Sequence, residues 1–380
     1  MIPDDWEVNF LHDCVTFLDS KRIPIKDSDR AKMAGSYPYY GASGIIDYVN
    51  NYIFDDDLIL LGEDGANIVD RSSELAFVIH GKCWINNHAH VLKPNSDFDI
   101  NFLANYLESL KYDQYNTGTA QPKLNREKCN LIPVLKPSLA EQQRIAKTLS
   151  DVDAVISTTE KLIQKKKNIK QGTMQQLLTG KKRLPGFATT TKFKQTELGD
   201  IPEDWEVMSI RETCFVFTGG EAPLIFSNEK NEMFKYPIYS NGKEVYGYYT
   251  SYTISQDAVC ISSIGENTGD VFYYTAKFMP IIRLKVIIPK IDRINTKYLY
   301  YFLKTRKIDG TKNGGIPNIN SNDVKELIFA IPSKQEQTAI ANVLSSIDKE
   351  IETLNTKLEK YRNLKTAMMQ QLLTGKIRLF

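Results

Sequence analysis

Basic, amide and tyrosine side chains lie in two groups of polar segments, and their chemistry suits contact with nucleic acid. Lys and Arg side chains position phosphates, whereas Asn, Gln and Arg can pair with base edges through two hydrogen bonds. The candidates in the first half of the chain are Lys21, Arg22, Tyr39, Tyr40, Gln121, Lys123, Asn125 and Arg126. The candidates in the second half are Tyr239, Asn241, Lys243, Lys312, Asn313, Asn318 and Asn320. Each residue taken alone has a more ordinary explanation, because Asn-rich loops are commonly turns and Tyr-Pro pairs commonly pack in cores.

Signatures of catalysis and of cofactor binding are absent from the sequence. It holds no G-x-x-x-x-G-K-[ST] phosphate loop, no G-x-G-x-x-G fingerprint and no N-P-P-Y-like methyltransferase motif. The acidic residues at 55–57 and 63–64 form the main cluster with metal-ligand chemistry, but the second half of the chain keeps only Glu266 of it. His88 and His90 have the spacing of a ligand pair on a strand, again without a counterpart. We therefore predict no catalytic residue, no metal and no cofactor.

The composition indicates a globular protein of more than one domain. The chain has 380 residues, of which 42% are hydrophobic and 25% are charged, enough for two or three domains with cores of their own. No apolar run approaches the roughly 20 residues of a membrane span, and we expect no signal peptide. The five cysteines stand far apart, which predicts reduced thiols in a cytoplasmic protein. A net charge of +2 neither indicates nor excludes a nucleic-acid partner.

The chain contains one long segment twice. The octapeptide MQQLLTGK at 174–181 returns letter for letter at 369–376. The pattern P-S-x-x-E-Q at 137–142 returns at 332–337 with the same offset. An eight-residue identity inside a longer block that aligns without gaps indicates a tandem duplication. The segments between the copies share only short anchors, as expected for two modules that do the same job on different targets.

Each copy of the repeated segment predicts one long helix, at 137–182 and at 332–380. The P-S-x-x-E pattern fits a capping box at each start, and Gly180 and Gly375 suit a left-handed residue at each end. Apolar residues recur at steps of three and four over about three to four heptads, which predicts a coiled coil about 60 Å long. The predicted seam residues are Ile145, Leu149, Val152, Ile156, Ile163, Ile340, Leu344, Ile347, Ile351, Leu354 and Leu358. The alternative is two amphipathic helices that pack separately on globular cores.

The remaining segments predict two α/β domains, at 1–136 and 201–331, joined by a linker at 183–200. Both domains open with the pattern P-x-D-W-E-V. Alternating apolar residues bounded by turn formers predict short strands, and apolar residues at helical spacing predict helices. The strands are expected at 58–61, 75–79, 259–261 and 281–288, and the helices at 98–110 and 296–304. Residues 181–200 are too polar and too broken by Pro and Gly to predict an element.

The order module, helix, module, helix favours antiparallel pairing of the two helices. Parallel pairing would require the short linker to span the whole length of the helices. Antiparallel pairing predicts two α/β modules separated by a spacer and related by a pseudo-two-fold axis. Two binding modules at a fixed separation suit a two-part linear target, and DNA, whose groove repeats every ~34–36 Å, is the obvious one.

The double layout resembles the specificity subunits of type I restriction-modification systems. The resemblance rests on the paired P-x-D-W-E-V and P-S-x-x-E-Q motifs, the long helices and the paired QQLLTGK ends, and it covers essentially the whole chain. It implies that each module is a target recognition domain for one half of a bipartite DNA site. It also implies that the helices set the gap between the halves and dock two methyltransferase subunits, which carry the S-adenosylmethionine and the N6-adenine chemistry. Restriction subunits would join this complex, and the chain itself would be non-catalytic.

Two other interpretations stay open from the sequence. One is a coiled-coil adaptor whose modules bind proteins, and the other is a fragment of a fused methyltransferase-nuclease. Gly172 stands inside the first helix where the second has Ala367, at a cost of about 1 kcal/mol. We interpret it as a soft point that lets the helix bend when methyltransferases close on DNA. The low net charge predicts weak DNA affinity for the chain alone.

Overall fold

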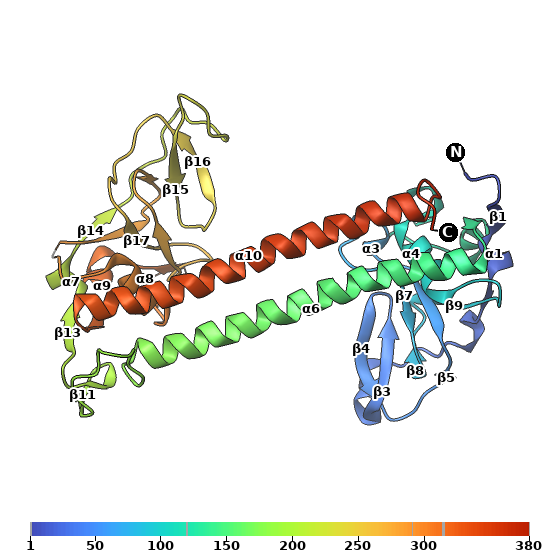
Figure 1. Cartoon of the computed structure of the whole chain (residues 1–380), viewed down its shortest axis with the longest axis horizontal. Helices are drawn as coiled ribbons and strands as arrows, with labels where there is room; N and C mark the ends of the chain where they lie inside the picture. Colours follow the sequence, from blue (N-terminus) through green and yellow to red (C-terminus); the bar gives the residue numbers. More distant parts are fainter. Residues whose placement is uncertain (1, 119–120, 291, 314–315, 380) are drawn as a thin grey trace. The chain divides into compact units, whose positions relative to one another are not determined.

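The chain divides into two compact units. The computed structural model describes residues 2–118, 121–290, 292–313 and 316–379. One unit consists of Met1–Glu160 with Thr356–Phe380, and the other consists of Lys161–Asn355. Each unit therefore contains one globular module and a part of both long helices (Figure 1).

Module 1, residues 2–136, is built on two sheets. The first has the strand order β2 (Val15–Phe17), β9 (Ala89–Pro94), β6 (Leu58–Gly62), β7 (Ala76–Ile79). The second has the order β4 (Gly44–Val49), β3 (Ala34–Gly41), β8 (Lys82–Ile85), β5 (Phe54–Asp55), with β3 and β8 parallel. A separate antiparallel pair joins β1 (Glu7–Phe10) to β10 (Pro133–Lys136). The helices are α1 (Leu11–Cys14), α2 (Asp27–Arg30), α3 (Asn67–Asp70), α4 (Ile100–Ser109) and α5 (Arg126–Asn130).

Module 2, residues 193–331, repeats this plan. Its sheets have the orders β14 (Cys214–Thr218), β20 (Lys285–Pro289), β17 (Ala258–Ile261), β18 (Val271–Tyr274), and β16 (Val245–Tyr249), β15 (Tyr236–Tyr239), β19 (Met279–Pro280). The separate pair is β13 (Glu206–Ser209) with β23 (Ile328–Ile331), and a hairpin joins β21 (Thr311–Asn313) to β22 (Ile316–Asn318). The helices are α7 (Ile210–Thr213), α8 (Thr296–Lys304) and α9 (Ser321–Lys325). The shared strand order confirms the tandem duplication of an α/β module.

Most of the predicted elements are present, with one shortened strand. Strands β6, β7 and β17 and helices α4 and α8 lie where the sequence predicts them. The strand predicted at 281–288 is wrong in its first half, because β20 begins only at Lys285. Ile282 and Arg283 have φ angles of 51° and 61°, and this left-handed backbone cannot continue a strand.

The predicted linker contains an element that the sequence did not indicate. Strand β11 (Phe193–Thr196) pairs antiparallel with β12 (Gly199–Pro202). The turn between them is closed by the Thr196 hydroxyl, which donates to the carbonyl of Gly199 at 2.8 Å. Most side chains of β11 are exposed, so the strand shows no apolar alternation that could have revealed it.

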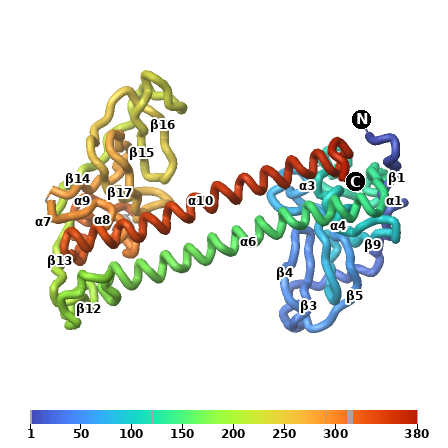
Figure 2. Tube along the Cα trace, in the orientation of Figure 1, coloured from blue at the N-terminus to red at the C-terminus, as the bar shows by residue number. Residues whose placement is uncertain are grey.

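The long helices α6 (Leu139–Leu177) and α10 (Lys334–Leu372) run antiparallel within each unit (Figures 1 and 2). In the first unit, Asp153 pairs with Lys365 at 2.7 Å and Glu160 pairs with Arg362 at 2.8 Å. In the second unit, Lys166 pairs with Glu350, and Lys170 pairs with Asp348 at 2.5 Å. In both units the partner's number falls as the number along α6 rises, which confirms the predicted direction.

The predicted seam residues divide into two groups. Ile145 and Leu149 are buried in the core of module 1 together with Leu372 and Leu373. Ile340 and Leu344 are buried in the same way in the core of module 2. The more central residues are half-buried or buried along the helices: Val152, Ile156, Ile163, Ile347, Ile351, Leu354 and Leu358. The ends of the helices thus pack in the cores of the modules, and their central parts pack along each other. The predicted pairing and the alternative of separate packing on globular cores both occur in one pair of helices.

The predicted capping boxes are half wrong. The hydroxyls of Ser138 and Ser333 accept hydrogen bonds from the third helical residues, Glu141 and Glu336, at 3.3 and 3.2 Å. Among the hydrogen bonds of the described residues, neither carboxylate accepts from the backbone N–H of its serine, and each binds an arginine instead. Arg378 donates to both oxygens of Glu141 at 2.7 and 2.8 Å. A carboxylate that also meets a nearby guanidinium exchanges a backbone partner for a stronger, charged one.

The same four-residue cluster occurs in both units. In the first unit, Arg378 also donates to both oxygens of Asp5 at 2.8 and 2.7 Å, and its guanidinium lies 5.5 Å from the ring of Trp6. In the second unit, Arg183 contacts Glu336, Asp204 and Trp205 in the same way. We call these groups the Arg–Glu–Trp clusters. They explain why D-W and E recur in both copies of the sequence, since each module is fastened to its helices through these residues.

The glutamine next to each of these glutamates is wholly buried and positions the next helix of its module. Gln142 donates to the carbonyls of Asp97 and Pro137, and its oxygen accepts from the N–H of Asp99, the N-cap of α4. Gln337 makes the equivalent three bonds beside Asn295, the N-cap of α8. A buried amide with all of these bonds made is costly to replace.

Gly180→Ala is expected to destabilise the second unit by about 1–3 kcal/mol. Gly180 has a φ of 69°, and a Cβ there would lie 2.4 Å from Pro202 and 3.3 Å from Trp205. Gly172→Ala is the matched control, because a Cβ at Gly172 meets nothing within 4 Å and helix propensity favours alanine. Urea denaturation should therefore shift the midpoint down for Gly180→Ala and slightly up for Gly172→Ala. Equal midpoints for the two variants would contradict the packing argument.

Candidate nucleic-acid interface

In module 1, polar loops from four parts of the chain meet beyond the ends of strands β6 and β9. We call residues 18–22, 62–65, 86–89 and 121–126 loop cluster 1. Backbone hydrogen bonds hold it together: Leu124 N–H donates to the Glu63 carbonyl at 2.7 Å, and Glu63 N–H donates to the His88 carbonyl at 2.8 Å. The fold thus brings Lys21 into one exposed area with Gln121 and Lys123, which lie about 100 residues later in the sequence.

A charged network lies beneath this surface. Arg22 donates to the Glu63 carboxylate at 2.6 Å and to the Ala89 carbonyl at 2.7 Å, and its side chain is only 14% exposed. Asp19 lies next to Arg22 and to the buried His90, whose Nδ1 is 2.7 Å from Asp19 Oδ2. Lys123 lies 3.5 Å from the other side of Glu63. The network fixes the loops, so Arg22 is a structural member of the cluster and not a free contact residue.

His90 is held in its protonated form by two acceptors. Its Nε2 lies 2.8 Å from the carbonyl of Leu124, and its Nδ1 faces the Asp19 carboxylate, so both ring nitrogens must donate. Burial alone would lower the pKa of His90, but its hydrogen bonds with Asp19 and Cys129, together with the negative charge of Asp19, raise it to about 10. The pKa of Asp19 is lowered, because these same contacts outweigh its burial. His90 is therefore an internal cation at neutral pH, and its ring nitrogens are occupied by Asp19 and Leu124.

The other candidates in module 1 separate into buried and exposed residues. Tyr39 is 1% exposed, and its hydroxyl accepts from the Ile25 N–H at 3.2 Å. Tyr40 is half-buried, and Asn125 caps α5 by accepting from the Lys128 N–H. Arg126 is exposed and lies with its guanidinium 5.0 Å from the ring of Phe17.

Module 2 has the corresponding assembly of loops. We call residues 218–220, 240–243, 262–267, 281–284 and 317–321 loop cluster 2. Asn241 is its central link, because its Oδ1 accepts from Ser263 N–H at 2.8 Å and its Nδ2 donates to the Ile282 carbonyl at 2.6 Å. Ile319 N–H donates to the Ser263 carbonyl at 2.9 Å. Asn241 is therefore committed to internal bonds, and the ordinary explanation of an Asn-rich loop applies to it.

The remaining candidates in module 2 have mixed environments. Tyr239 stacks on Tyr274 with ring centroids 3.6 Å apart. Asn320 caps α9 in a capping box with Asp323, and Asn318 pairs with Ile264 in an isolated bridge. Lys243 is exposed. The backbone of Lys312 and Asn313 belongs to β21, but their side chains lie outside the described part of the molecule.

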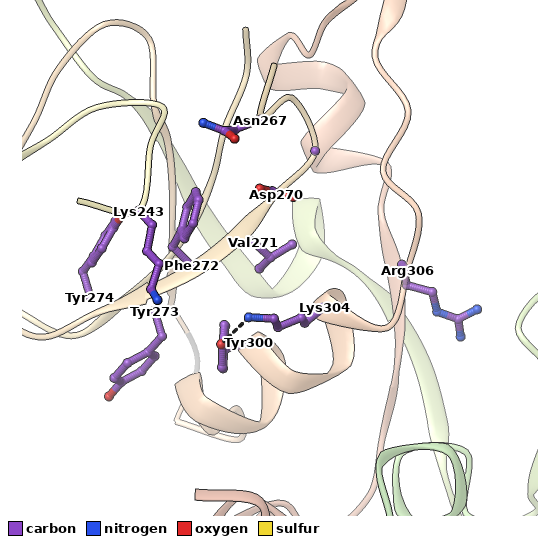
Figure 3. A pocket seen from close by; sticks show the side chains of 11 residues that line it. Lys243, Asn267, Asp270, Val271, Phe272, Tyr273, Tyr274, Tyr300, Lys304 and Arg306 are labelled. Atoms are coloured by element: carbon purple, nitrogen blue, oxygen red, sulfur yellow. Dashed lines mark hydrogen bonds between the residues drawn. The ribbon is translucent and has the colours of Figure 1, made fainter. Parts of the chain in front are cut away.

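A cavity of about 640 Å³ lies beside loop cluster 2, and the sequence did not reveal it (Figure 3). Lys243, Tyr300 and Lys304 line it with Asn267, Asp270 and the ring of Phe272. Lys304 donates to the Tyr300 hydroxyl at 2.9 Å. Lys304 stands nine residues after the N-cap of α8, and Glu108 stands nine residues after the N-cap of α4, where it pairs with Arg71 at 2.6 Å. The two modules thus differ in charge at an equivalent place, as expected for modules with different targets.

The residues with metal-ligand chemistry are engaged with one another or with cations. Asp56 pairs with Lys93, Asp57 lies 2.9 Å from His80, and His88 lies 3.0 Å from Asp64. Among the described residues, no group of three or more His, Cys, Asp or Glu side chains is placed to hold a metal ion. No helix in the described part is long and apolar enough to cross a membrane.

Comparison with known proteins gives matches over the whole chain. The family model described as "Type I restriction modification DNA specificity domain" matches twice, at residues 3–171 and 202–360. The MjaVIII specificity subunit of Methanocaldococcus jannaschii is 25% identical over 100% of this chain and 94% of its own length. The EcoDI specificity subunit of Escherichia coli is 22% identical over 99% and 89%. A crystal structure of an S subunit from M. genitalium shares the fold with a TM-score of 0.69, at 14% identity over 98% of this chain and 96% of that one.

Proposed function

Because the chain belongs to the type I restriction-modification DNA specificity family, we propose that it selects the DNA sequence on which a type I restriction-modification complex acts. Each module recognises one half of a bipartite, asymmetric site. The helices α6 and α10 set the gap between the two halves. The chain contributes recognition, and the methyl transfer and cleavage belong to the partner subunits.

One observation carries this proposal: the same module, with a loop cluster at the same strand ends, occurs twice beside an antiparallel helix pair. Two loop clusters of different composition suit two different base sequences. The exposed cations Lys21, Lys123 and Arg126 in module 1, and Lys243 and Arg283 in module 2, are suited to phosphates and base edges. Gln121 adds an exposed amide. These residues replace the buried or internally bonded candidates as the proposed contact set.

The helices also supply a surface for the two methyltransferase subunits. In the second unit, Leu162 and Ile169 are exposed on α6, seven residues apart and so on one helical face. Leu162 lines a groove of about 360 Å³ with Leu354, Lys349 and Glu350 of α10. Exposed leucine and isoleucine side chains along a helix pair suit a protein partner. Restriction subunits would join the complex through the methyltransferases.

The test is a genome-wide map of N6-methyladenine by single-molecule sequencing, in the strain that carries this gene and in its deletion. We expect one bipartite motif with a fixed gap to lose methylation in the deletion and to regain it on complementation. An unchanged map, in a strain where the tagged chain copurifies with methyltransferase subunits, would overturn the proposal. A tagged chain that captures no methyltransferase would favour the adaptor interpretation instead.

A further inference from the structure

Lys285 is a buried lysine at the edge of loop cluster 2. It is the first residue of β20 and is 6% exposed. Its Nζ lies 3.2 Å from the hydroxyl of Thr218 and 3.4 Å from the hydroxyl of Ser321, and these two hydroxyls lie 3.1 Å apart. Thr218 is exposed and Ser321 is half-exposed. The three polar groups thus form a triangle that reaches the surface through its hydroxyls.

No carboxylate forms a salt bridge with Lys285 among the described residues. Burial lowers the pKa of Lys285, and the neighbouring charge of Arg283 lowers it further. Asp323 acts in the opposite direction from a distance, but its carboxylate already accepts from the Asn320 N–H at 2.8 Å. A buried ammonium without a paired anion is unfavourable, and the fold supplies no anion at this position. An anion from outside the protein would therefore stabilise the charge of Lys285.

At the equivalent position, module 1 has a buried cation that is paired with a carboxylate. Strand β6 pairs Leu61 with His90, and strand β17 pairs Ile261 with Lys285, so His90 and Lys285 occupy equivalent positions. In module 1, Asp19 supplies the negative charge to His90. In module 2, Thr218 stands opposite Lys285 on the neighbouring strand and carries only a hydroxyl. The duplicated fold therefore keeps the buried cation in both modules but keeps its counter-ion in one.

We propose that Lys285, Thr218 and Ser321 bind one backbone phosphate of DNA in module 2, at a site that module 1 does not have. The ammonium and the two hydroxyls are donors of the kind that bind phosphodiester oxygens, and a charge-assisted bond of this type is stronger than a neutral one. The phosphate anion completes the charge balance that Asp19 provides internally in module 1. The site rests on the proposed function, because it assigns a contact to module 2 as a DNA-recognition domain.

The test compares DNA binding by the complex purified through a tag on this chain, carrying either the wild-type residue or Lys285→Met. Fluorescence anisotropy with the duplex identified by the methylation map gives the affinity at several salt concentrations. We expect Lys285→Met to reduce the slope of log K against log salt by about 0.9 and to weaken binding roughly three- to tenfold, without changing the preferred sequence. Lys290→Met is the matched control, because Lys290 directly follows the other end of the same strand and donates to the Arg211 carbonyl.

A second measurement locates the phosphate. Single methylphosphonate substitutions remove one backbone charge at a time from the duplex. One position in the half-site of module 2 should weaken wild-type binding and have no effect on Lys285→Met. A Thr218→Val/Ser321→Ala variant, which retains the lysine, should lose part of the same effect if Lys285→Met does not fold.

The outcomes separate the two proposals. A Lys285→Met complex with the wild-type salt slope and the wild-type methylphosphonate profile would overturn the phosphate site while leaving the proposed function intact. Equal loss of slope in Lys285→Met and Lys290→Met would also overturn it, because the effect would then be a general change of charge. A wild-type complex that does not bind the duplex identified by the methylation map would overturn the proposed function itself.

Discussion

Arg183→Ala is expected to lower the free energy of unfolding of the second unit by about 3–5 kcal/mol. Arg183 donates to both oxygens of Glu336 at 2.6 and 2.7 Å and to both oxygens of Asp204 at 2.9 and 3.0 Å. The side chain of Glu336 is 1% exposed. Removal of the guanidinium leaves a buried carboxylate without its counter-charge, which is far more costly than the loss of an exposed ion pair. The variant also removes the cation from the face of Trp205.

The control for Arg183→Ala is Arg211→Ala, which makes the same chemical change in the same unit. Arg211 pairs with Glu326, and both side chains are more than half exposed, so the expected loss is within about 1 kcal/mol. Pulse proteolysis of the two variants in urea, with peptides of module 2 quantified by mass spectrometry, measures the difference. Similar midpoints for both variants would show that the Arg–Glu–Trp cluster does not fasten the module to its helices.

The equivalent cluster of the first unit should respond to acid. Burial tends to raise the pKa of Glu141, but Arg378 and the indole N–H of Trp6 outweigh it, so the pKa of Glu141 is lowered. A lowered carboxyl pKa stabilises the folded state above the unfolded pKa, and this stabilisation is lost as pH falls through the folded value. Arg378→Ala should therefore weaken the acid dependence of the first unit as well as its stability at neutral pH.

Module 1 is expected to lose stability as pH rises from about 7 towards 10. The folded pKa of His90 is about 10 and its ordinary value is 6.5. A raised pKa stabilises the folded state below the unfolded value, and the contribution disappears as pH rises through the folded value. The full effect is on the order of 4 kcal/mol, at about 1.4 kcal/mol for each pH unit. The buried thiols of Cys14 and Cys83 do not titrate in this window, because burial raises the pKa of each to about 12.

Pulse proteolysis in urea at pH 7 and at pH 9.5 measures this loss, with peptides of module 1 and module 2 quantified separately by mass spectrometry. His90→Gln should be less stable than wild type at pH 7 and should show a much smaller change between the two pH values. Asp19→Asn should act in the same direction, because it removes the partner that keeps the imidazolium charged. The same pH dependence in wild type and His90→Gln would mean that His90 is neutral in the folded module.

The architecture could be predicted because the sequence patterns that indicate it extend over many residues. A heptad pattern sustained over some 40 residues and an exact repeat at a fixed offset leave few alternatives, and the helices and the duplication are confirmed. Capping boxes were only half right for a local reason: sequence shows that Ser138 and Glu141 are correctly spaced, but not that Arg378 arrives from the far end of the chain. Tertiary partners of this kind compete with local bonds and cannot be seen in a short window.

The contact residues were harder to predict because asparagine side chains also form the hydrogen bonds that hold loops and helix ends together, and a side chain used in this way is not free to contact a ligand. Asn125 and Asn320 are N-caps, and the side-chain amide of Asn241 bonds two backbone groups and one hydroxyl. Lys285 was not among the candidates, because it stands in an apolar run that indicates a buried strand. The one signal available was a lysine at a position where strand alternation leaves no exposed face.

The core of module 1 contains Leu372 and Leu373 together with Trp6, Ile145 and Leu149. During synthesis, the core of module 1 therefore remains incomplete until Leu372 and Leu373 have left the ribosome. At about 5–20 residues per second, this delay is on the order of tens of seconds after residue 136. Module 2 draws its core from residues 174–344 and can be completed earlier, although it comes second in the chain. Folding thus finishes in the reverse of the order of translation, and any chain truncated before residue 372 leaves its first module with an open core.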